Sequence, residues 1–426
     1  MAANTIVGFD PFDPEQIADP YPAYRWMRDQ APVYYDDAND LWLVTRYDDC
    51  VKVVRDPSTF SSKLGMRRLM TGLDLGRRTS QQFADTVEPL QYLTDLRMLI
   101  AMDPPDHVRL RRLVNRAFTP KHIGLSEDWI RSLCEEHFEH LLAVDADGRA
   151  DWVGDFTWPF PVMVIAELLG IPTSLKRDFK RWSDDLIGLF GGKGADAELA
   201  VTSFMELLAF FDEAIARRRA EPADDLISML IHNAEEEDEP LSSDEMVLFC
   251  VLLLVAGNET TTNLLSNGMK VLASTPGVLE RLRRQPTAIP AAVEEILRYD
   301  APVQALPRGT KQPIELHGTS IPVASTVLVF FGAANRDERQ FRDPDRFDVD
   351  RGATDHIAFG NGIHLCLGAP LARLEGRIAL ETLCRHVTEV ELTAAPVPTE
   401  GPLLRGARSM PITLRTTQGE RLTNHD

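Results

Sequence analysis

The stretch Asp244–Ser274 constrains the fold more than any other, because it is a helix candidate of about 45 Å at 1.5 Å per residue. Its first half is apolar on nearly all sides, so the helix should cross the interior of a domain. The longest apolar run, Met246–Ala256, reaches about half of the ~20 residues that a membrane helix needs. We therefore predict a buried central helix and no membrane anchor.

The composition supports a large core in a globular protein. The chain has 426 residues, of which 44% are hydrophobic and 26% are charged. Its net charge of −20 disfavours binding to nucleic acid or to anionic lipid surfaces. The five cysteines form no CxxC pair, and the N-terminus has neither a basic nor an apolar leader segment. A reduced, cytoplasmic setting is expected.

Helix signals dominate the middle of the chain, and strand signals are short. Further helices are predicted at 106–118, 126–142, 160–169, 173–190, 195–219 and 290–298. Strands are predicted at 41–45, at 389–393, at 412–414 and in a hairpin with a strand over 313–331. No repeat or linker divides the chain, so we predict one mainly α (α+β) domain over residues 1–426.

The segment FGNGIHLCLG, Phe359–Gly368, carries the clearest chemical signal. Its glycines predict a tight turn, and Pro370 suits the first turn of a helix. Cys366 would lie just before that helix, where backbone N–H groups stabilise a thiolate. Such a cysteine suits a haem iron ligand, a catalytic nucleophile or a buried structural residue. The remaining cysteines are interpreted as structural: Cys50, Cys134, Cys250 and Cys384.

Three other segments are ambiguous when each is considered alone. The polar interruption Ala256–Thr261 in the central helix fits a kink as well as a functional site. Glu295 and Arg298 lie three residues apart on one helical face, as ordinary surface pairs also do. The stretch 103–111 fits a solvated basic helix.

Taken together, and in their order along the chain, these segments resemble the cytochrome P450 family, whose haem iron is held by a cysteine thiolate. The resemblance extends from about residue 10 to residue 414. It implies a P450-type domain with haem b (iron protoporphyrin IX) between the central helix and the cysteine loop. It also implies a haem-thiolate monooxygenase that inserts one oxygen atom of O2 into a lipophilic small molecule.

The resemblance assigns roles residue by residue. Cys366 becomes the iron ligand, Gly257 opens space for dioxygen, Thr260 bonds the oxygen and Glu259 supplies protons. The haem-binding residues become His107, Arg111, Ala256, Arg308, Phe359, His364 and Gly368. Glu295, Arg298 and Arg346 become a buried structural triad.

Electrons must come from another protein, and the resemblance implies a ferredoxin with its NAD(P)H-dependent reductase. A basic strip in this acidic chain is the predicted docking patch: Arg109, Arg112, Arg116 and Lys121. An ordinary solvated helix face is the competing interpretation. The predicted pocket is lined by Leu252, Leu253, Val303 and Leu306, which an ordinary core would also explain.

The substrate classes that suit such a pocket are terpenoid, steroid, fatty acyl and macrolide-like. Three other functions remain open: a peroxygenase that uses hydrogen peroxide, a non-catalytic haem sensor or carrier, and a cysteine hydrolase that uses Cys366 with His364. Retention of Glu259 and Thr260 argues against the first two.

Overall fold

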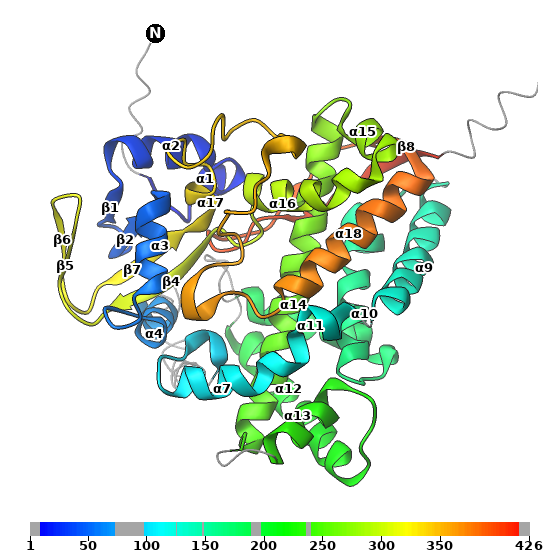
Figure 1. The fold of residues 1–426 in the computed structure, drawn as a ribbon, viewed down its shortest axis with the longest axis horizontal. Helices are drawn as coiled ribbons and strands as arrows, with labels where there is room; N and C mark the ends of the chain where they lie inside the picture. Colours follow the sequence, from blue (N-terminus) through cyan, green and yellow to red (C-terminus); the bar gives the residue numbers. More distant parts are fainter. Residues whose placement is uncertain are drawn as a thin grey trace, which may run out of the picture.

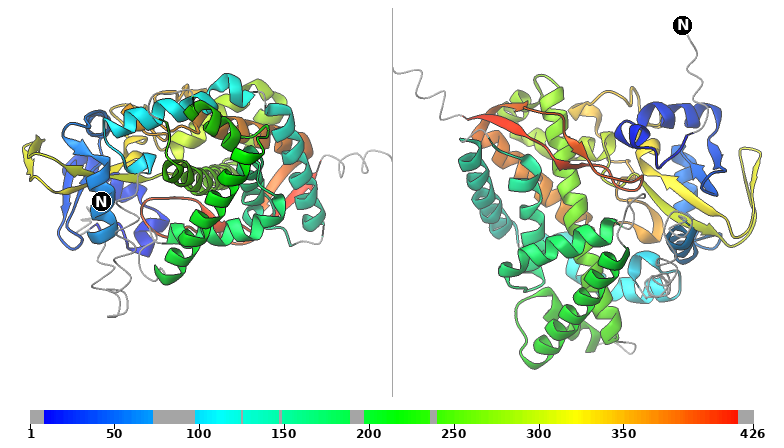
Figure 2. Two further views of the ribbon diagram at one scale, coloured as in Figure 1. Left: turned by 90° about the horizontal axis from the view of Figure 1, so that it is seen from below. Right: turned by 180° about the vertical axis from the view of Figure 1, so that it is seen from behind.

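The computed structural model describes residues 9–72, 98–124, 126–146, 149–188, 197–235 and 240–416. A helix-rich part packs beside a smaller part that contains the main sheet (Figure 1). The central helix α14 (Ser243–Ser274) runs through the helical part. Seen nearly along its axis, α14 is surrounded by other helices (Figure 2, left). The predicted helix-rich α+β class is confirmed.

The remaining elements have the following bounds. The helices are α1 (Pro14–Ala18), α2 (Tyr21–Gln30), α3 (Tyr47–Arg55), α4 (Ser62–Gly72), α7 (Asp106–Asn115), α8 (Pro120–Gly124), α9 (Glu127–Asp145), α10 (Pro159–Leu168), α11 (Lys176–Gly188), α12 (Ala197–Ala220), α13 (Leu226–Glu235), α15 (Val278–Arg284), α16 (Ile289–Tyr299), α17 (Phe331–Ala334) and α18 (Ala369–His386). The strands are β1 (Val33–Asp36), β2 (Leu41–Val44), β3 (Phe60–Ser61), β4 (Ala305–Thr310), β5 (Ile314–Leu316), β6 (Thr319–Ile321), β7 (Thr326–Phe330), β8 (Val387–Leu392), β9 (Val397–Pro398), β10 (Ala407–Ser409) and β11 (Ile412–Thr416).

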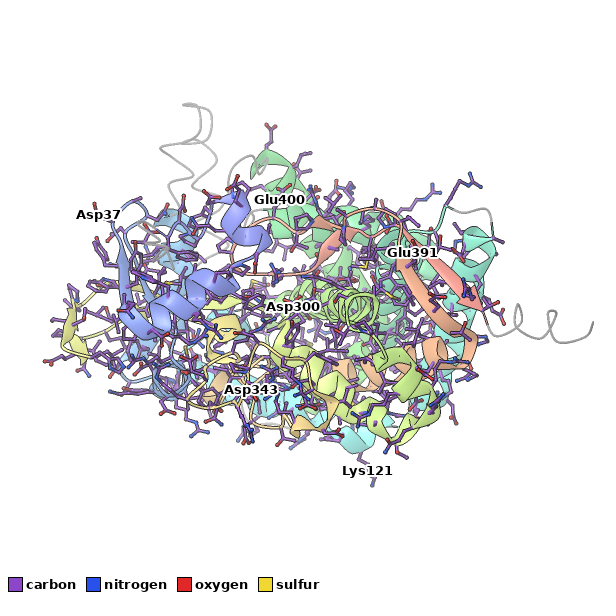
Figure 3. All side chains as sticks on the ribbon, turned by 90° about the horizontal axis from the view of Figure 1, so that it is seen from above. Asp37, Lys121, Asp300, Asp343, Glu391 and Glu400 are labelled. Carbon is purple, nitrogen blue, oxygen red and sulfur yellow. The ribbon has the colours of Figure 1, made fainter. Side chains whose placement is uncertain are left out.

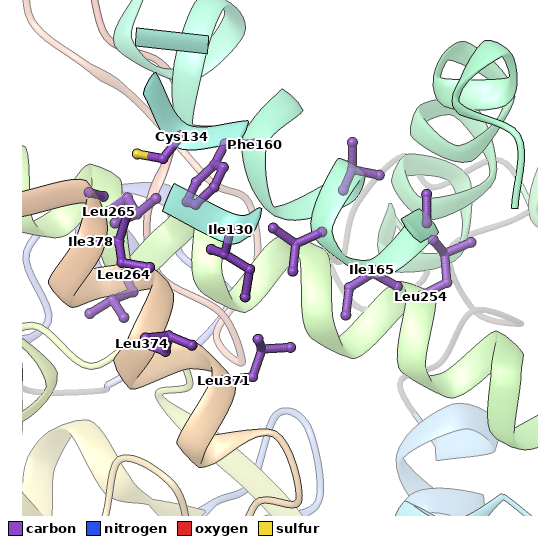
Figure 4. Packing of buried hydrophobic residues seen from close by; sticks show 14 of the residues in the cluster. Ile130, Cys134, Phe160, Ile165, Leu254, Leu264, Leu265, Leu371, Leu374 and Ile378 are labelled. Carbon is purple, nitrogen blue, oxygen red and sulfur yellow. The ribbon is translucent and has the colours of Figure 1, made fainter. Parts of the chain in front are cut away.

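Helix α14 begins with a complete capping box. The side chain of Ser242 accepts a hydrogen bond from the N–H of Glu245, whose carboxylate accepts one from the N–H of Ser242. Apolar side chains from α9, α10 and α18 pack around its middle, as Figure 4 shows for Ile165 and Leu374. Among the described residues α14 is long and apolar enough to cross a membrane, but most of its apolar stretch is buried inside the fold. It is therefore a core helix, as predicted.

The main sheet has the strand order β1-β2-β7-β4-β3, in which β2 and β7 are parallel and the other neighbours are antiparallel. Strand β7 is buried along its whole length because both faces of the sheet are covered. Val327 and Val329 face one apolar cluster, whereas Leu328 and Phe330 face the other, as the alternation of a strand requires. The sheet holds β4, and with it Arg308, against α4.

Candidate active site

The loop before α18 has the tight turn that its glycines predict. Gly360 and Gly362 have φ values of 72° and 69°, a backbone region that favours glycine. A Cβ atom on Gly362 would lie 2.6 Å from the carbonyl oxygen of Val54, so this position also lacks room for a side chain. The N–H of Cys366 donates to the carbonyl of Phe359 at 2.9 Å and closes the loop. The cysteine is thereby held just before the first turn of α18.

The sulfur of Cys366 is accessible although many protein atoms surround it. Its side chain is exposed, yet burial among protein atoms raises the pKa of its thiol. The backbone N–H groups of Gly368 and Ala369 and the charge of Arg111 act in the opposite direction and favour the thiolate. A Cβ atom added to Gly368 would meet no atom within 4 Å. An accessible sulfur with open space beside it leaves room for a broad, flat group.

The other cysteines are buried, which agrees with their structural interpretation. Within the described parts of the chain, no group of three or more His, Cys, Asp or Glu side chains is placed to hold a metal ion. Cys366 thus offers one sulfur ligand. A single protein ligand suits a metal that a macrocycle already holds.

One face of α14 carries Leu252, Ala256 and Thr260 at intervals of one turn. Ala256 is exposed, and the other two are partly exposed, although the helix as a whole is buried. The hydroxyl of Thr260 donates to the carbonyl of Ala256 at 2.7 Å. This bond satisfies the hydroxyl within the helix and fixes its direction. The face therefore presents small and hydroxyl-bearing groups toward unfilled space.

The packing of Gly257 gives this residue a role that the sequence did not predict. A Cβ atom at this position would lie 2.8 Å from Cδ1 of Ile165 on α10. Gly257 therefore allows α14 and α10 to approach closely, and its part in opening space for dioxygen stays a prediction. The exposed position is the preceding residue, Ala256. Helix packing decides this, because consecutive residues point about 100° apart around a helix.

The carboxyl of Glu259 has a pKa close to neutral pH. Burial raises the pKa of its carboxyl to about 7, and the negative charge of Asp184 contributes in the same direction while Lys180 opposes it. Lys180 and Asp184 form an ion pair of 3.1 Å on α11. Because the folded pKa exceeds the ordinary 4.5, the associated stabilisation is present below pH 4.5 and is lost as the pH rises through about 7. Near neutral pH this carboxyl can both give and take a proton.

Basic side chains from α7, β4 and the cysteine loop lie close together. The rings of His107 and His364 have centroids 4.2 Å apart. Arg308 is buried, and burial lowers the pKa of its guanidinium to about 10 despite the opposing charge of Asp103. Arg308 and Arg111 lie close enough to both histidines to lower their pKa values, after burial as the main cause. A group of this kind attracts anions.

The two histidines differ in their hydrogen-bond partners. Nε2 of His364 lies 2.9 Å from the hydroxyl of Ser62, and the backbone of Met102 bonds the same imidazole. Burial lowers the pKa of His364 to about 2 and that of His107 to about 4, so both rings are neutral at pH 7. Both ring nitrogens of His107 are buried and have no hydrogen-bond partner among the residues that the structure describes. Sequence reasoning missed Ser62, which no motif marks.

These residues fit a haem. The unpartnered nitrogens of His107, together with Arg111 and Arg308, match the need of propionate carboxylates for donors and positive charge. The open space at Gly368 and the accessible sulfur of Cys366 match a macrocycle with a thiolate ligand. Phe359 closes the same loop, and the guanidinium of Arg373 lies 4.6 Å from the centre of its ring.

A buried ion pair supports the cysteine side of the site. Glu295 and Arg298 are almost fully buried and are joined by bonds of 2.7 and 2.8 Å. The predicted third member is wrong. The side chain of Arg346 is 70% exposed and pairs with Asp348, whereas Nε of Arg351 donates to Glu295 at 3.0 Å. Arg346 contributes only its carbonyl oxygen, 3.4 Å from Arg298. Residue spacing does not show which of two nearby arginines turns inward.

We expect Glu295→Gln to destabilise the protein by about 3–5 kcal/mol, because it leaves the buried charge of Arg298 without its counter-ion. Denaturant unfolding of the holoprotein measures this change. Glu280→Gln is the matched control, since its pair with Arg284 lies on the surface at 58% and 79% exposure. There the same substitution should change stability by about 1 kcal/mol or less. Equal effects of the two substitutions would contradict the buried role.

The comparisons with known proteins agree with this geometry. Residues 155–404 match the family model described as cytochrome P450. The chain is 41% identical to the putative cytochrome P450 YjiB of Bacillus subtilis over 92% of each chain. The chain belongs to the cytochrome P450 family.

Solved P450 structures confirm the fold. CYP109B1 from Bacillus subtilis, described as a versatile P450, matches with a TM-score of 0.78 and 40% identity over 95% of this chain and 100% of the other. CYP109E1 from Bacillus megaterium, in complex with testosterone, matches with a TM-score of 0.80 and 36% identity over 93% and 98%. The protein is thus a haem-containing P450 monooxygenase, as the sequence predicted.

The predicted pocket residues of this P450 lie at the edges of its apolar clusters. Leu252, Val303 and Leu306 are partly exposed. Leu253 is also partly exposed, but it stands one turn before Gly257 on the stripe that meets α10. It is therefore placed differently from Leu252, which shares its face with Ala256.

Only three of the four residues of the predicted docking patch of this P450 are exposed. Arg112, Arg116 and Lys121 are exposed, and Lys121 stands at the rim of the molecule in Figure 3. Arg109 is only 17% exposed and forms an ion pair with Glu245, the capping residue of α14. Arg109 thus joins α7 to the start of α14, and the exposed patch consists of the other three residues.

Proposed function

We propose that this P450 is a cytoplasmic monooxygenase of lipophilic small molecules with haem b as its cofactor, and that a ferredoxin with its NAD(P)H-dependent reductase supplies the electrons. The main support is the face of α14, where the carbonyl of Ala256 holds the Thr260 hydroxyl, together with the accessible sulfur of Cys366 before α18. Next to Thr260 in the chain stands Glu259, with a pKa of about 7. A proton source beside a hydroxyl donor is what reductive use of O2 requires.

The haem, when bound, supplies the cleavage of O2 and the insertion of oxygen into the substrate. The protein supports this chemistry with its own groups. Glu259 exchanges protons near neutral pH, and the hydroxyl of Thr260 is oriented by its bond to Ala256. His107, Arg111 and Arg308 would hold the propionates. The apolar side chains of Leu252 and Val303 would exclude water from the substrate.

For the substrate class, the testosterone complex of CYP109E1 makes steroids the first molecules to test. Terpenoid, fatty acyl and macrolide-like molecules remain in the same panel. A binding substrate displaces water near the iron, which changes the spin state and the absorption spectrum. A titration should show this change for lipophilic members, whereas polar sugars of similar mass should give none.

The electron source is tested by comparing two oxidant systems on one substrate. With a ferredoxin, its reductase and NAD(P)H, we expect product that needs O2. Turnover supported by hydrogen peroxide alone, at a higher rate, would instead favour the peroxygenase. Binding of haem without turnover in either system would favour a sensor or carrier.

We expect the double charge reversal Arg112→Glu with Arg116→Glu to slow reduction by ferredoxin by roughly tenfold or more, because complementary charge steers association. Stopped-flow reduction at low and high ionic strength measures the effect, which salt should diminish. The charge reversal Arg408→Glu is the control. Arg408 is exposed in β10, far in sequence from the patch, and its reversal should leave the rate unchanged. A normal, salt-independent rate in the double variant would remove the patch from consideration.

A further inference from the structure

Asp300 is a buried carboxylate directly after α16, where the chain turns toward the pocket segment that contains Val303. Oδ1 accepts from the hydroxyl of Tyr21 at 2.5 Å and from Nε of Arg405 at 2.7 Å, and Oδ2 lies 3.2 Å from Nζ of Lys270. Although burial acts in the opposite direction, these partners hold the pKa of Asp300 well below its usual range. Figure 3 shows Asp300 in the interior, beside α14. The carboxylate is therefore charged and held from several sides.

Arg405 is held just as completely. Nε binds Asp300, Nη1 donates to the carbonyl of Ile17 at 2.8 Å, and Nη2 donates to that of Ala18 at 3.1 Å. A planar guanidinium with all its nitrogens bound cannot rotate. Its backbone is tied as well, because Asn267 of α14 donates to the carbonyls of both Arg405 and Asp300.

Between these two charged residues, segments far apart in sequence pair like strands. The N–H of Arg405 donates to Pro302, the N–H of Gln304 donates to Leu403, and Val303 stands opposite Leu404. Residues that stand opposite each other in an antiparallel pair share a face. Leu403 is buried in the cluster around Phe330. Val303 and Leu404, both partly exposed, therefore lie on the other face.

Net stability alone does not account for an ion pair at this point. A buried pair is often no more stabilising than apolar residues of similar size, but its geometry is directional. Here the bonds set the separation of two backbone segments whose partly exposed side chains stand opposite one another. Asp300 binds Lys270 near the end of α14, but among the described residues no hydrogen bond links Asp300 or Arg405 to the part of α14 that carries Ala256 and Thr260.

We propose that Asp300 and Arg405, with the hydroxyl of Tyr21, are positioning residues that set the substrate-facing wall formed by Val303 and Leu404. This inference rests on the pocket of the proposed function. It assigns substrate selectivity to residues that do not touch the substrate. Loosening the pair should move the wall while the haem and its thiolate ligand stay in place.

The test uses the holoenzyme and two nitrogen ligands of haem iron. Imidazole senses the iron alone, whereas 4-phenylimidazole also needs room for its ring against the wall. Spectral titration yields Kd for both. In Arg405→Lys, which keeps the charge but not the fork of bonds, we expect Kd for 4-phenylimidazole to rise about tenfold, which corresponds to about 1.4 kcal/mol of lost binding free energy. Kd for imidazole should stay within about twofold.

Arg408→Lys is the matched control, since Arg408 lies three residues further on in an exposed pair with Glu400 at 2.8 Å. It should change neither Kd. Tyr21→Phe removes one hydroxyl and should produce a smaller shift with the same selectivity, so it replaces Arg405→Lys if that variant does not fold. Unchanged Kd values, or equal shifts for both ligands, would overturn the proposal. Neither titration needs a substrate or a ferredoxin, so failure here is distinct from failure of the proposed function.

Discussion

Cys366→Ala is expected to abolish both turnover and the thiolate-type spectrum of the reduced carbon monoxide complex, in which the Soret band lies far to the red. The physical reason is that Cys366 provides the accessible sulfur before α18, where N–H groups of Gly368 and Ala369 favour its thiolate. Alanine cannot replace this ligand. Because the side chain faces open space, its loss should leave little packing defect, and the fold should persist.

Absorption spectra with and without carbon monoxide, recorded together with circular dichroism, separate loss of the ligand from loss of the fold. Cys384→Ala is the control. Cys384 lies in α18, the helix that follows Cys366, and is buried, so its removal should leave the spectrum unchanged while stability falls. A thiolate-type spectrum that persisted in Cys366→Ala would show that another residue holds the iron.

The second large effect concerns proton delivery. Thr260→Ala and Glu259→Gln should each lower coupled product formation by about 10²-fold or more, the usual contribution of a positioned acid or base. Because Glu259 has a pKa of about 7, the wild-type rate should fall as the pH rises through 7 and its proton is lost. Glu259→Gln has no proton to lose there, so this step in the pH profile should disappear.

The ratio of product formed to NAD(P)H consumed, measured from pH 6 to pH 9, checks this prediction. Glu213→Gln on the exposed side of α12 is a matched control and should keep the wild-type profile. If Glu259→Gln retained the same step near pH 7, another group would be the proton source. Uptake of haem should be normal in all three variants, since none of these residues is part of the basic cluster.

Several features could be predicted because neighbouring residues decide them. The spacing of apolar residues predicted α14 to within a residue, since a long run that cannot meet water must cross the core. The glycines of the segment 359–368 predicted its tight turn, because φ values near 70° favour glycine. Strand β4, by contrast, contains Pro307 and Gly309, residues that weaken strands, and only its place beside the buried β7 makes it one.

The sequence did not show the direction in which side chains point. Gly257 stands in the motif, yet the approach of Ile165 from α10 determines which face it occupies. Arg346 and Arg351 are both near in sequence, and the turn between them sends only Arg351 toward Glu295. Local spacing contains no information about such choices.

The sequence by itself determined the family, the fold class and the long central helix, and it pointed to Cys366 as the proposed iron ligand. These follow from local patterns whose physical causes act within one helix or one turn. The tertiary structure alone decided that Glu259 has a pKa near 7, that the nitrogens of His107 find no partner in the described part of the chain, and that Arg405 reaches Asp300. Burial and pairing depend on groups brought together from distant parts of the chain, so they exist only once the chain has folded.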